Sequence, residues 1–335
     1  MGAESNKIAI LMTGWQAIQF SVANQDKMCQ FDIVLVTGAW SRSILDGFKI
    51  VELAGFDKYG RLPPRKMFSA ISQLWEIVKA IPDDLELWRP DIGGHVVEYL
   101  SRSKKIKKIV FIEDGIGSIA VKQPVMLRIR NRLRLLVFLS LAGSIFRKKT
   151  NDVINLVLDD VSHKIPENGD VIIAKDEYLL ASRAISKKKY PSAKLLVLTQ
   201  PISEMGYMTI SQEIKMQQDL LAIAHKNRGE INAIAIKPHP GEADEFLGVR
   251  RDALKNNRDI DVITIDKEVP AELYYISLDC PPEVIVSYCS SALLNIKKAF
   301  RGSHCIAFIA KDLRRFVPDE VIESFVEMGV DVHEG

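Results

Sequence analysis

Short apolar runs, each followed by turn residues, recur along the chain. They include "KIAILMTG", "FDIVLVTG", "KKIVFIEDG", "AKLLVLTQP", "INAIAIKPHP" and "EVIVSYCSS". Between many of these runs, residues 65–80, 211–225 and 291–300 carry apolar side chains at spacings of three and four, which predicts amphipathic helices. Continuous apolar strands that alternate with such helices are typical of parallel sheets covered on both faces. We therefore predict an α/β fold.

The apolar runs also predict more than one domain. They number roughly ten, which exceeds what one small doubly wound sheet usually contains. We expect two Rossmann-like domains that face each other across a cleft. The charged segment "SKKKYPSAK" contains Pro191 and precedes a new strand, so the boundary is placed there. Residues 1–190 then form the first domain, residues 191–316 form the second, and residues 317–335 form a C-terminal helix that could pack back on the first.

Composition and charge limit the class of partner. The chain has 335 residues, 47% of them hydrophobic, which is enough for a sizeable core. Its formal net charge is +2, so no global field favours nucleic acid as a partner. The four cysteines show no CxxC spacing, and the N-terminus lacks the basic and small-residue signals of a secretory leader. These features predict a cytoplasmic protein.

One basic segment departs from the alternation of strands and helices. It carries Arg128, Arg130, Arg132 and Arg134, followed by an apolar run that is too short to span a bilayer. A helix of this kind would suit an anionic membrane surface, which would place the protein peripherally at the inner face of a bacterial membrane. It would equally suit a basic groove for an anionic glycan, or a core-packed helix with a solvated basic face.

Two groups of polar residues follow predicted strands, where open α/β sheets bind their ligands. In "FIEDGIGS", a first-domain strand is followed by Glu113, Asp114 and Gly115, which form either a functional carboxylate loop or an ordinary Asp-Gly turn. In "LLVLTQPISE", Thr199 and Gln200 close the first strand of the second domain. They could contact a base or a phosphate, or simply form a turn.

Two further groups lie at later strand ends. The apolar run "INAIAI" stops at Lys237, and His239 follows between two prolines, the second of which is Pro240. Proline lacks a backbone N–H and fixes φ, so the imidazole is held on a stiff turn, and we interpret it as functional. Ser290 and Ser291 follow another strand and open a helix, where they would either bind a phosphate or cap the helix.

The order of these motifs resembles that of a known family. "EDG", "LTQP", "KPHP", "VPAEL" and the strand-end serine pair are similar to the motif series of bacterial sialyltransferases, especially the lipooligosaccharide sialyltransferases and the capsular polysialyltransferases. The resemblance spans much of the chain. It implies a two-domain GT-B type fold, CMP-sialic acid or a related CMP-nonulosonate as donor, a glycan acceptor, inversion at the anomeric carbon, and no metal or other cofactor.

The resemblance also assigns roles by position. Glu113 would be the general base on the acceptor hydroxyl, and His239 would protonate or hydrogen-bond the departing CMP phosphate. Ser290 and Ser291 would hold that phosphate, and Glu272 in "VPAEL" would bind the ribose hydroxyls.

The remaining donor-site residues follow from the same resemblance and from the chemistry. Thr199 and Gln200 would lie near the nucleotide, beside Pro240. The transition state of transfer is oxocarbenium-like, so the leaving phosphate needs charge stabilisation. A cationic His239, Lys237 and a helix N-terminus would supply it.

Other functions stay open at this point. "KPHP" followed by a strand-end serine pair also resembles the CDP-glycerol polymerising transferases of teichoic acid synthesis, so the donor could carry another cytidine nucleotide. A non-catalytic nucleotide- or glycan-binding scaffold in envelope assembly would share the fold. A GT-B like sugar epimerase would favour UDP-sugars. The acceptor, the linkage and the oligomeric state are not specified by the sequence.

Overall fold

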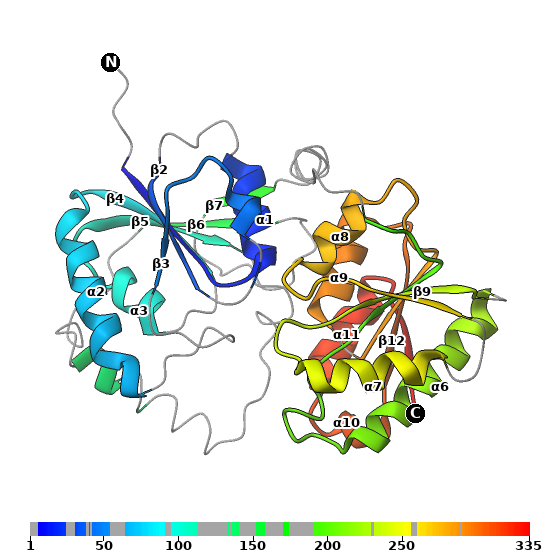
Figure 1. The fold of residues 1–335 in the computed structure, drawn as a ribbon. Coiled ribbons are helices and arrows are strands. Elements are labelled where there is room, and N and C mark those ends of the chain that lie inside the picture. The colour runs from blue at the N-terminus through cyan, green and yellow to red at the C-terminus, as the bar shows by residue number, and fades with distance from the viewer. Residues whose placement is uncertain are drawn as a thin grey trace. The chain divides into compact units, whose positions relative to one another are not determined.

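The computed structural model describes fourteen stretches of the chain: residues 6–24, 31–37, 40, 42–53, 64–90, 95–112, 133, 136–140, 152–157, 170–173, 190–228, 231–255, 260–288 and 290–335. The chain divides into two compact units. The first comprises Met1–Asp114 and Gln123–Ala181, and the second comprises Gly115–Lys122 and Ser182–Gly335. Each unit contains one parallel sheet with helices beside it (Figure 1). The predicted α/β fold with two parallel sheets is confirmed.

The first unit is built on a sheet of seven described strands in the order β3-β2-β1-β4-β5-β6-β7, all parallel. The strands are β1 (Lys7–Leu11), β2 (Phe31–Val36), β3 (Ile50–Glu52), β4 (Leu85–Pro90), β5 (Ile106–Ile112), β6 (Asp152–Val157) and β7 (Asp170–Ile173). The helices are α1 (Gly14–Asn24), α2 (Met67–Ala80) and α3 (His95–Ser101), with 3-10 turns at Arg42–Leu45 and Pro64–Lys66.

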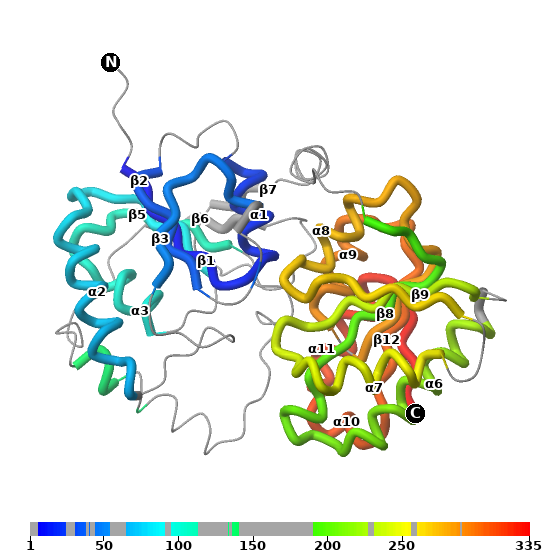
Figure 2. The backbone as a smooth tube through the Cα atoms, in the orientation of Figure 1, coloured from blue at the N-terminus to red at the C-terminus, as the bar shows by residue number. Residues whose placement is uncertain are grey.

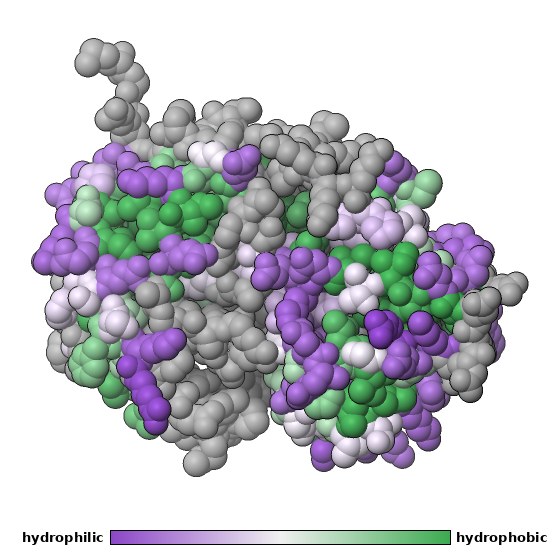
Figure 3. Space-filling model, viewed as in Figure 1, coloured by the Kyte–Doolittle hydropathy of each residue, from purple (hydrophilic) through white to green (hydrophobic). Residues whose placement is uncertain are grey.

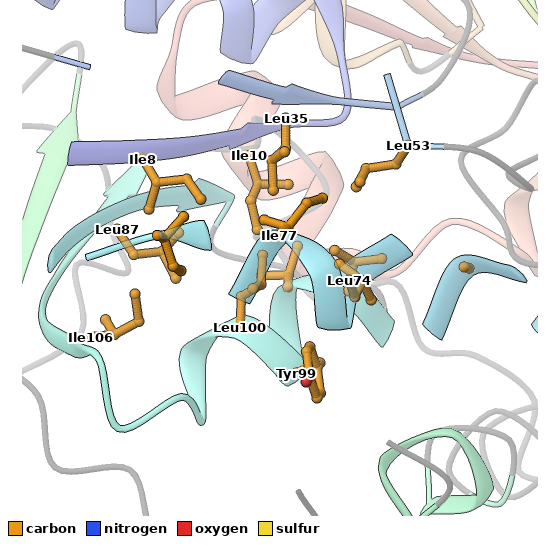
Figure 4. Close-up of a cluster of buried hydrophobic side chains, with 14 of the residues drawn as sticks. Ile8, Ile10, Leu35, Leu53, Leu74, Ile77, Leu87, Tyr99, Leu100 and Ile106 are labelled. Atoms are coloured by element: carbon orange, nitrogen blue, oxygen red, sulfur yellow. The ribbon is translucent and has the colours of Figure 1, made fainter. Parts of the chain in front are cut away.

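Alternate residues of these strands face opposite sides of the sheet, as extended backbone requires. Ile8, Ile10 and Leu87 lie in the hydrophobic cluster that the sheet forms with α2 and α3 (Figure 4). Trp88, the next residue of β4, faces the other side, where its ring centroid lies 5.9 Å from that of Phe20 on α1. Both faces of the sheet are therefore covered by helices of the same unit.

The second unit is built on six strands in the order β10-β9-β8-β11-β12-β13, again all parallel. The strands are β8 (Leu195–Leu198), β9 (Ala233–Lys237), β10 (Asp261–Thr264), β11 (Val284–Ser287), β12 (His304–Ile309) and β13 (Asp331–Glu334). The helices are α6 (Ile210–Arg228), α7 (Asp244–Lys255), α8 (Ala271–Ser277), α9 (Ser291–Ala299), α10 (Lys311–Arg314) and α11 (Asp319–Glu327). Counted from β8, this is the doubly wound order 3-2-1-4-5-6.

Two cores flank this second sheet. Leu196 and Leu198 of β8 belong to the cluster formed with α8, α9 and α11, whereas Leu195 and Val197 belong to the cluster formed with α6. The two sets of helices lie on opposite sides of the sheet in Figure 1, and Figure 2 shows β8 in the sheet's interior beside β9. The helices predicted over residues 65–80, 211–225 and 291–300 correspond to α2, α6 and α9, so these predictions are confirmed.

The C-terminal helix belongs to the second unit. Val321 and Phe325 of α11 are buried in the same cluster as Leu293 of α9, so its apolar stripe is covered by this unit's own core. The suggestion that residues 317–335 pack back on the first domain stays a prediction. β13, which pairs with β12, was not predicted because "DVHE" lacks the apolar run of a central strand and forms an edge strand instead.

The basic segment contributes partly to the first unit's core. Phe138 and Leu139 are buried in the cluster with α2 and α3, while Leu133, Leu136 and Val137 are 57%, 48% and 52% exposed. The core-packed interpretation therefore holds for the two buried residues. The face of the molecule in Figure 3 carries hydrophobic areas on both units, interrupted by hydrophilic residues. No described helix is long and apolar enough to cross a membrane.

Candidate active site

The second sheet brings three of the predicted groups to the carboxyl ends of neighbouring strands. β8 and β11 are neighbours from which the strand order runs in opposite directions, and ligands of open α/β sheets bind at the carboxyl ends of such strands. Thr199 follows β8, Lys237 ends β9, and Ser290 follows β11 closely. Thr199 therefore lies beside the end of β9, which carries Lys237 38 positions later in the sequence (237 minus 199), and beside the end of β11, which is followed by Ser290 91 positions later (290 minus 199).

His239 lies on a turn closed by three hydrogen bonds. Its backbone N–H donates to Oε1 of Glu242 at 2.7 Å, the Gly241 N–H donates to Nδ1 of the imidazole at 3.0 Å, and the Glu242 N–H donates to the His239 carbonyl at 3.0 Å. Because Nδ1 accepts, this geometry assigns the ring proton to Nε2. The turn therefore presents an imidazole whose Nε2–H is the donor.

The imidazole is neutral in the free protein. Burial, reinforced by the nearby charge of Lys237, lowers the pKa of His239 to about 4. The cationic imidazole was expected beside a bound CMP phosphate, and for that state it stays a prediction. A bound anion beside Nε2 would favour the protonated form and raise the pKa again.

Lys237 holds the turn rather than presenting a free charge. Its side chain is 4% exposed, and its ammonium donates to the carbonyls of Pro238 and, at 3.2 Å, of Lys267. Burial lowers the pKa of Lys237 to about 8, which leaves the group mostly protonated at neutral pH. The ammonium thereby ties the turn after β9 to the loop after β10.

Thr199 is an internal link between two strand ends. It is 1% exposed, its N–H donates to the Lys237 carbonyl at 3.2 Å, and its hydroxyl donates to Oε1 of Glu242 at 2.7 Å. Gln200, the next residue, is partly exposed, as is Pro240 on the neighbouring turn. Gln200 and Pro240, like His239, therefore have surface open to a ligand, whereas Thr199 does not.

Glu272 and the serine pair stand at two helix starts. Glu272 of α8 is 6% exposed and accepts a hydrogen bond at 2.9 Å from Nδ2 of Asn295 on α9, and burial raises the pKa of its carboxyl. Ser290 is the N-cap of α9, with its hydroxyl accepting from the Ala292 N–H at 3.3 Å. The capping interpretation is therefore confirmed for Ser290, and Ser291 is exposed at the first helical position.

Sequence reasoning missed the buried ion cluster behind these turns. Arg250 of α7 is fully buried and contacts three carboxylates, those of Glu204, Glu213 and Glu242, at 2.7 to 3.0 Å. Although burial alone would lower the pKa of Arg250, the hydrogen bonds that it donates to Glu204 and Glu213, together with the negative charge of Glu242, raise this pKa above its ordinary value. The sequence contained part of this information, because Glu204 lies three residues after "LTQP" and Glu242 lies two residues after "KPHP".

The first-domain candidates are not all described. These residues lie outside the described part of the chain: Glu113, Asp114, Gly115, Arg128, Arg130, Arg132 and Arg134. Among the described residues, no group of three or more His, Cys, Asp and Glu side chains could hold a metal ion.

Two doubly wound parallel sheets give the chain a fold of the GT-B type. Residues 49–308 match the alpha-2,8-polysialyltransferase (POLYST) family, and this match covers well over half of the chain. The chain belongs to the alpha-2,8-polysialyltransferase family and is a sialyltransferase, as its motifs predicted. No curated protein matches it.

Solved structures are similar in fold. The chain is similar to an alpha/beta-galactoside alpha-2,3-sialyltransferase from the luminous marine bacterium Photobacterium phosphoreum, with a TM-score of 0.52, 11% identity and 98% of each chain covered. It is also similar to the spinosyn rhamnosyltransferase SpnG in complex with thymidine diphosphate, with a TM-score of 0.46, 11% identity, and 97% of this chain and 91% of that chain covered.

Proposed function

We propose that the chain transfers sialic acid from CMP-sialic acid to a glycan hydroxyl, with inversion at the anomeric carbon and without a metal ion. The observation that carries the proposal is the meeting of Gln200, the His239 turn and the start of α9 at one edge of the second sheet. A donor in this place would have polar groups on its base side and a helix N-terminus at its phosphate. Family membership supports sialic acid as the transferred sugar.

In this proposal, the reaction is a single displacement. The acceptor oxygen forms a bond to the anomeric carbon while the bond from that carbon to the phosphate oxygen breaks, and CMP leaves with the electron pair. Glu113 takes the acceptor proton, as in general base catalysis. His239 donates a hydrogen bond from Nε2–H to the departing phosphate and keeps this proton, so the bond stabilises the negative charge that the phosphate gains.

The remaining site residues would bind the donor. Ser290 and Ser291 would contact the phosphate, Ser291 through its exposed hydroxyl and N–H. Glu272 would accept hydrogen bonds from the ribose hydroxyls. Lys237 would contribute positive potential from behind the turn rather than direct contact, since its ammonium is engaged by carbonyls.

The first-domain candidates would serve the acceptor. We assign residues 1–190 to acceptor binding and residues 191–316 to donor binding. Each residue of a sialic acid polymer carries a carboxylate, so the four arginines between Arg128 and Arg134 would suit such an acceptor or an anionic membrane surface. Capsule or lipooligosaccharide synthesis at the inner face of a bacterial membrane is the setting in which both would occur.

The test combines donor selection with turnover. In a thermal-shift comparison of CMP, CDP, UDP and GDP, CMP should stabilise the protein most, by about 2.7 kcal/mol at a concentration of about a hundred times Kd. CMP release from CMP-sialic acid should depend on an oligosialic acid acceptor and persist with EDTA, and the product's anomeric configuration should be opposite to the donor's. Preference for UDP or GDP would remove the proposal, and preference for CDP with CDP-glycerol turnover would favour the teichoic acid type of reaction.

A further inference from the structure

The guanidinium of Arg250 has all of its N–H groups engaged by carboxylates. Nε donates to Oε1 of Glu213 at 2.7 Å, and Nη2 donates to Oε2 of the same residue at 3.0 Å. Nη1 and Nη2 donate to the two oxygens of Glu204 at 3.0 and 2.8 Å. Nη1 also donates to Oε2 of Glu242 at 2.9 Å. A planar fork with five donors fits this set, whereas an ammonium would not.

Two of these carboxylates close the strand-end turns of the site. Glu204 lies in the loop after β8 and accepts from the N–H of Ala243, just past the turn after β9, at 3.1 Å. Glu242 accepts from the Thr199 hydroxyl and the His239 N–H with Oε1, while Oε2 faces Arg250. The Arg250 guanidinium therefore connects the two turns, once through Glu204 and once through Glu242.

Burying the charged groups of this cluster costs free energy that apolar core packing would not cost. One guanidinium faces three carboxylates, and burial raises the pKa of Glu242 despite the hydrogen bonds it accepts. Lys237 is a further cation that acts on Glu242, but its ammonium donates elsewhere. Buried ion clusters are often no more stabilising than apolar groups of the same volume. What this cluster supplies beyond packing is a defined geometry for the turns.

We propose that Arg250 is a positioning residue for sialyl transfer and that it acts through Glu242 on the backbone of His239. It fixes Oε2 of Glu242, so Oε1 stays directed at the His239 N–H and the turn holds Nε2 in one orientation. The inference rests on the proposed function of His239 as the group that contacts the departing phosphate.

A double-variant cycle in the full chain, with CMP-sialic acid as donor, tests this proposal. Arg250→Lys keeps the charge but loses the fork. We expect it to lower kcat roughly 10- to 100-fold, because small displacements of a reacting group are costly, with KM for the donor changed less than about threefold. In a His239→Ala background, the same substitution should lower kcat by less than about twofold, since the group to be positioned is absent.

The matched control is Arg251→Lys. Arg251 is the next residue of α7, is exposed, and contacts Asp252 at 3.6 Å, so kcat should stay at the wild-type value. If Arg250→Lys does not fold by circular dichroism, Glu242→Gln takes its place in the cycle with the same expected results.

The outcomes separate the two proposals. An equal loss of kcat in both backgrounds, or no loss in either, overturns the positioning role of Arg250 while leaving the proposed function of His239 in place. Full turnover by His239→Ala alone contradicts the proposed function of His239 itself, and the positioning role falls with it.

Discussion

The two sheets share a doubly wound order but differ in the connections that follow their central strands. β1 leads into α1 through Met12 and Thr13 alone. Gln16 accepts from the N–H groups of both residues at 2.8 and 3.1 Å, and the Thr13 hydroxyl accepts from the Gln16 N–H at 3.2 Å. This capping box closes the helix start on itself.

The second sheet has longer connections at the corresponding place. Residues 199–209 separate β8 from α6, and residues 238–243 separate β9 from α7. These loops carry Gln200 and His239 at the surface and are fixed from behind by Arg250. The comparison teaches that two sheets of the same topology can differ at the carboxyl ends of their strands, because loop length and loop side chains differ between them.

The largest effect is expected from a substitution in the first unit's core, which should lower stability and leave CMP affinity unchanged. Phe20 is fully buried on α1, and its ring centroid lies 4.8 Å from that of Phe31. Phe20→Ala should lower the free energy of unfolding by about 3–5 kcal/mol because of the cavity it creates. Urea unfolding followed by circular dichroism measures this loss, and CMP affinity by calorimetry should stay unchanged below the transition. A large loss of CMP affinity would mean that the first unit supports the donor site.

The next largest effect is expected at His239. His239→Ala should lower turnover on the order of 10²-fold or more, the usual scale for a positioned acid, while CMP binding weakens much less. Steady-state kinetics and calorimetry on the same preparation distinguish the two quantities. Loss of the folded state instead would identify the turn as a structural corner.

Protonation of His239 should make the stability of the folded protein depend on pH. Its ordinary pKa is 6.5, and burial lowers it to about 4 in the folded protein. The unfolded chain therefore binds the proton more readily, so stability is unaffected well above pH 6.5 and falls as the pH drops from there toward 4. His239→Gln should lack this part of the loss. In an NMR titration, CMP should raise the imidazole pKa by about one unit or more; no shift would place the phosphate elsewhere.

The smallest effects come from a matched pair of helix caps. Thr13→Ala and Ser290→Ala should each lower the free energy of unfolding by about 1 kcal/mol, because each removes a hydroxyl that accepts a backbone N–H. Only Ser290→Ala should also weaken CMP binding, by roughly fivefold for one lost hydrogen bond. Equal CMP affinity in the two variants would argue against Ser290 as a phosphate ligand.

The strand-end residues of the second unit could be placed from sequence because their positions follow directly from apolar runs that end at turns. Lys237 and Ser290 were located in this way. The cluster around Arg250 could not be, since it depends on α6 and α7 lying on one face of the sheet. The low pKa of His239 in the free protein could not be predicted from the sequence either, because it follows from burial, which is a property of the fold. The roles given to Glu113 and the arginines of the basic segment stay predictions, because these residues lie outside the described part of the chain.

Trp88, which packs against Phe20 in the first unit, contributes to the intrinsic fluorescence of the protein. The chain contains four tryptophans, at positions 15, 40, 75 and 88, and all of them belong to the first unit. Excitation at the red edge of the protein absorption band therefore selects emission from that unit alone, and the second unit contributes tyrosine signals only. The emission of the unmodified protein thus reports on the first unit, so that its unfolding can be followed separately from that of the unit that carries His239.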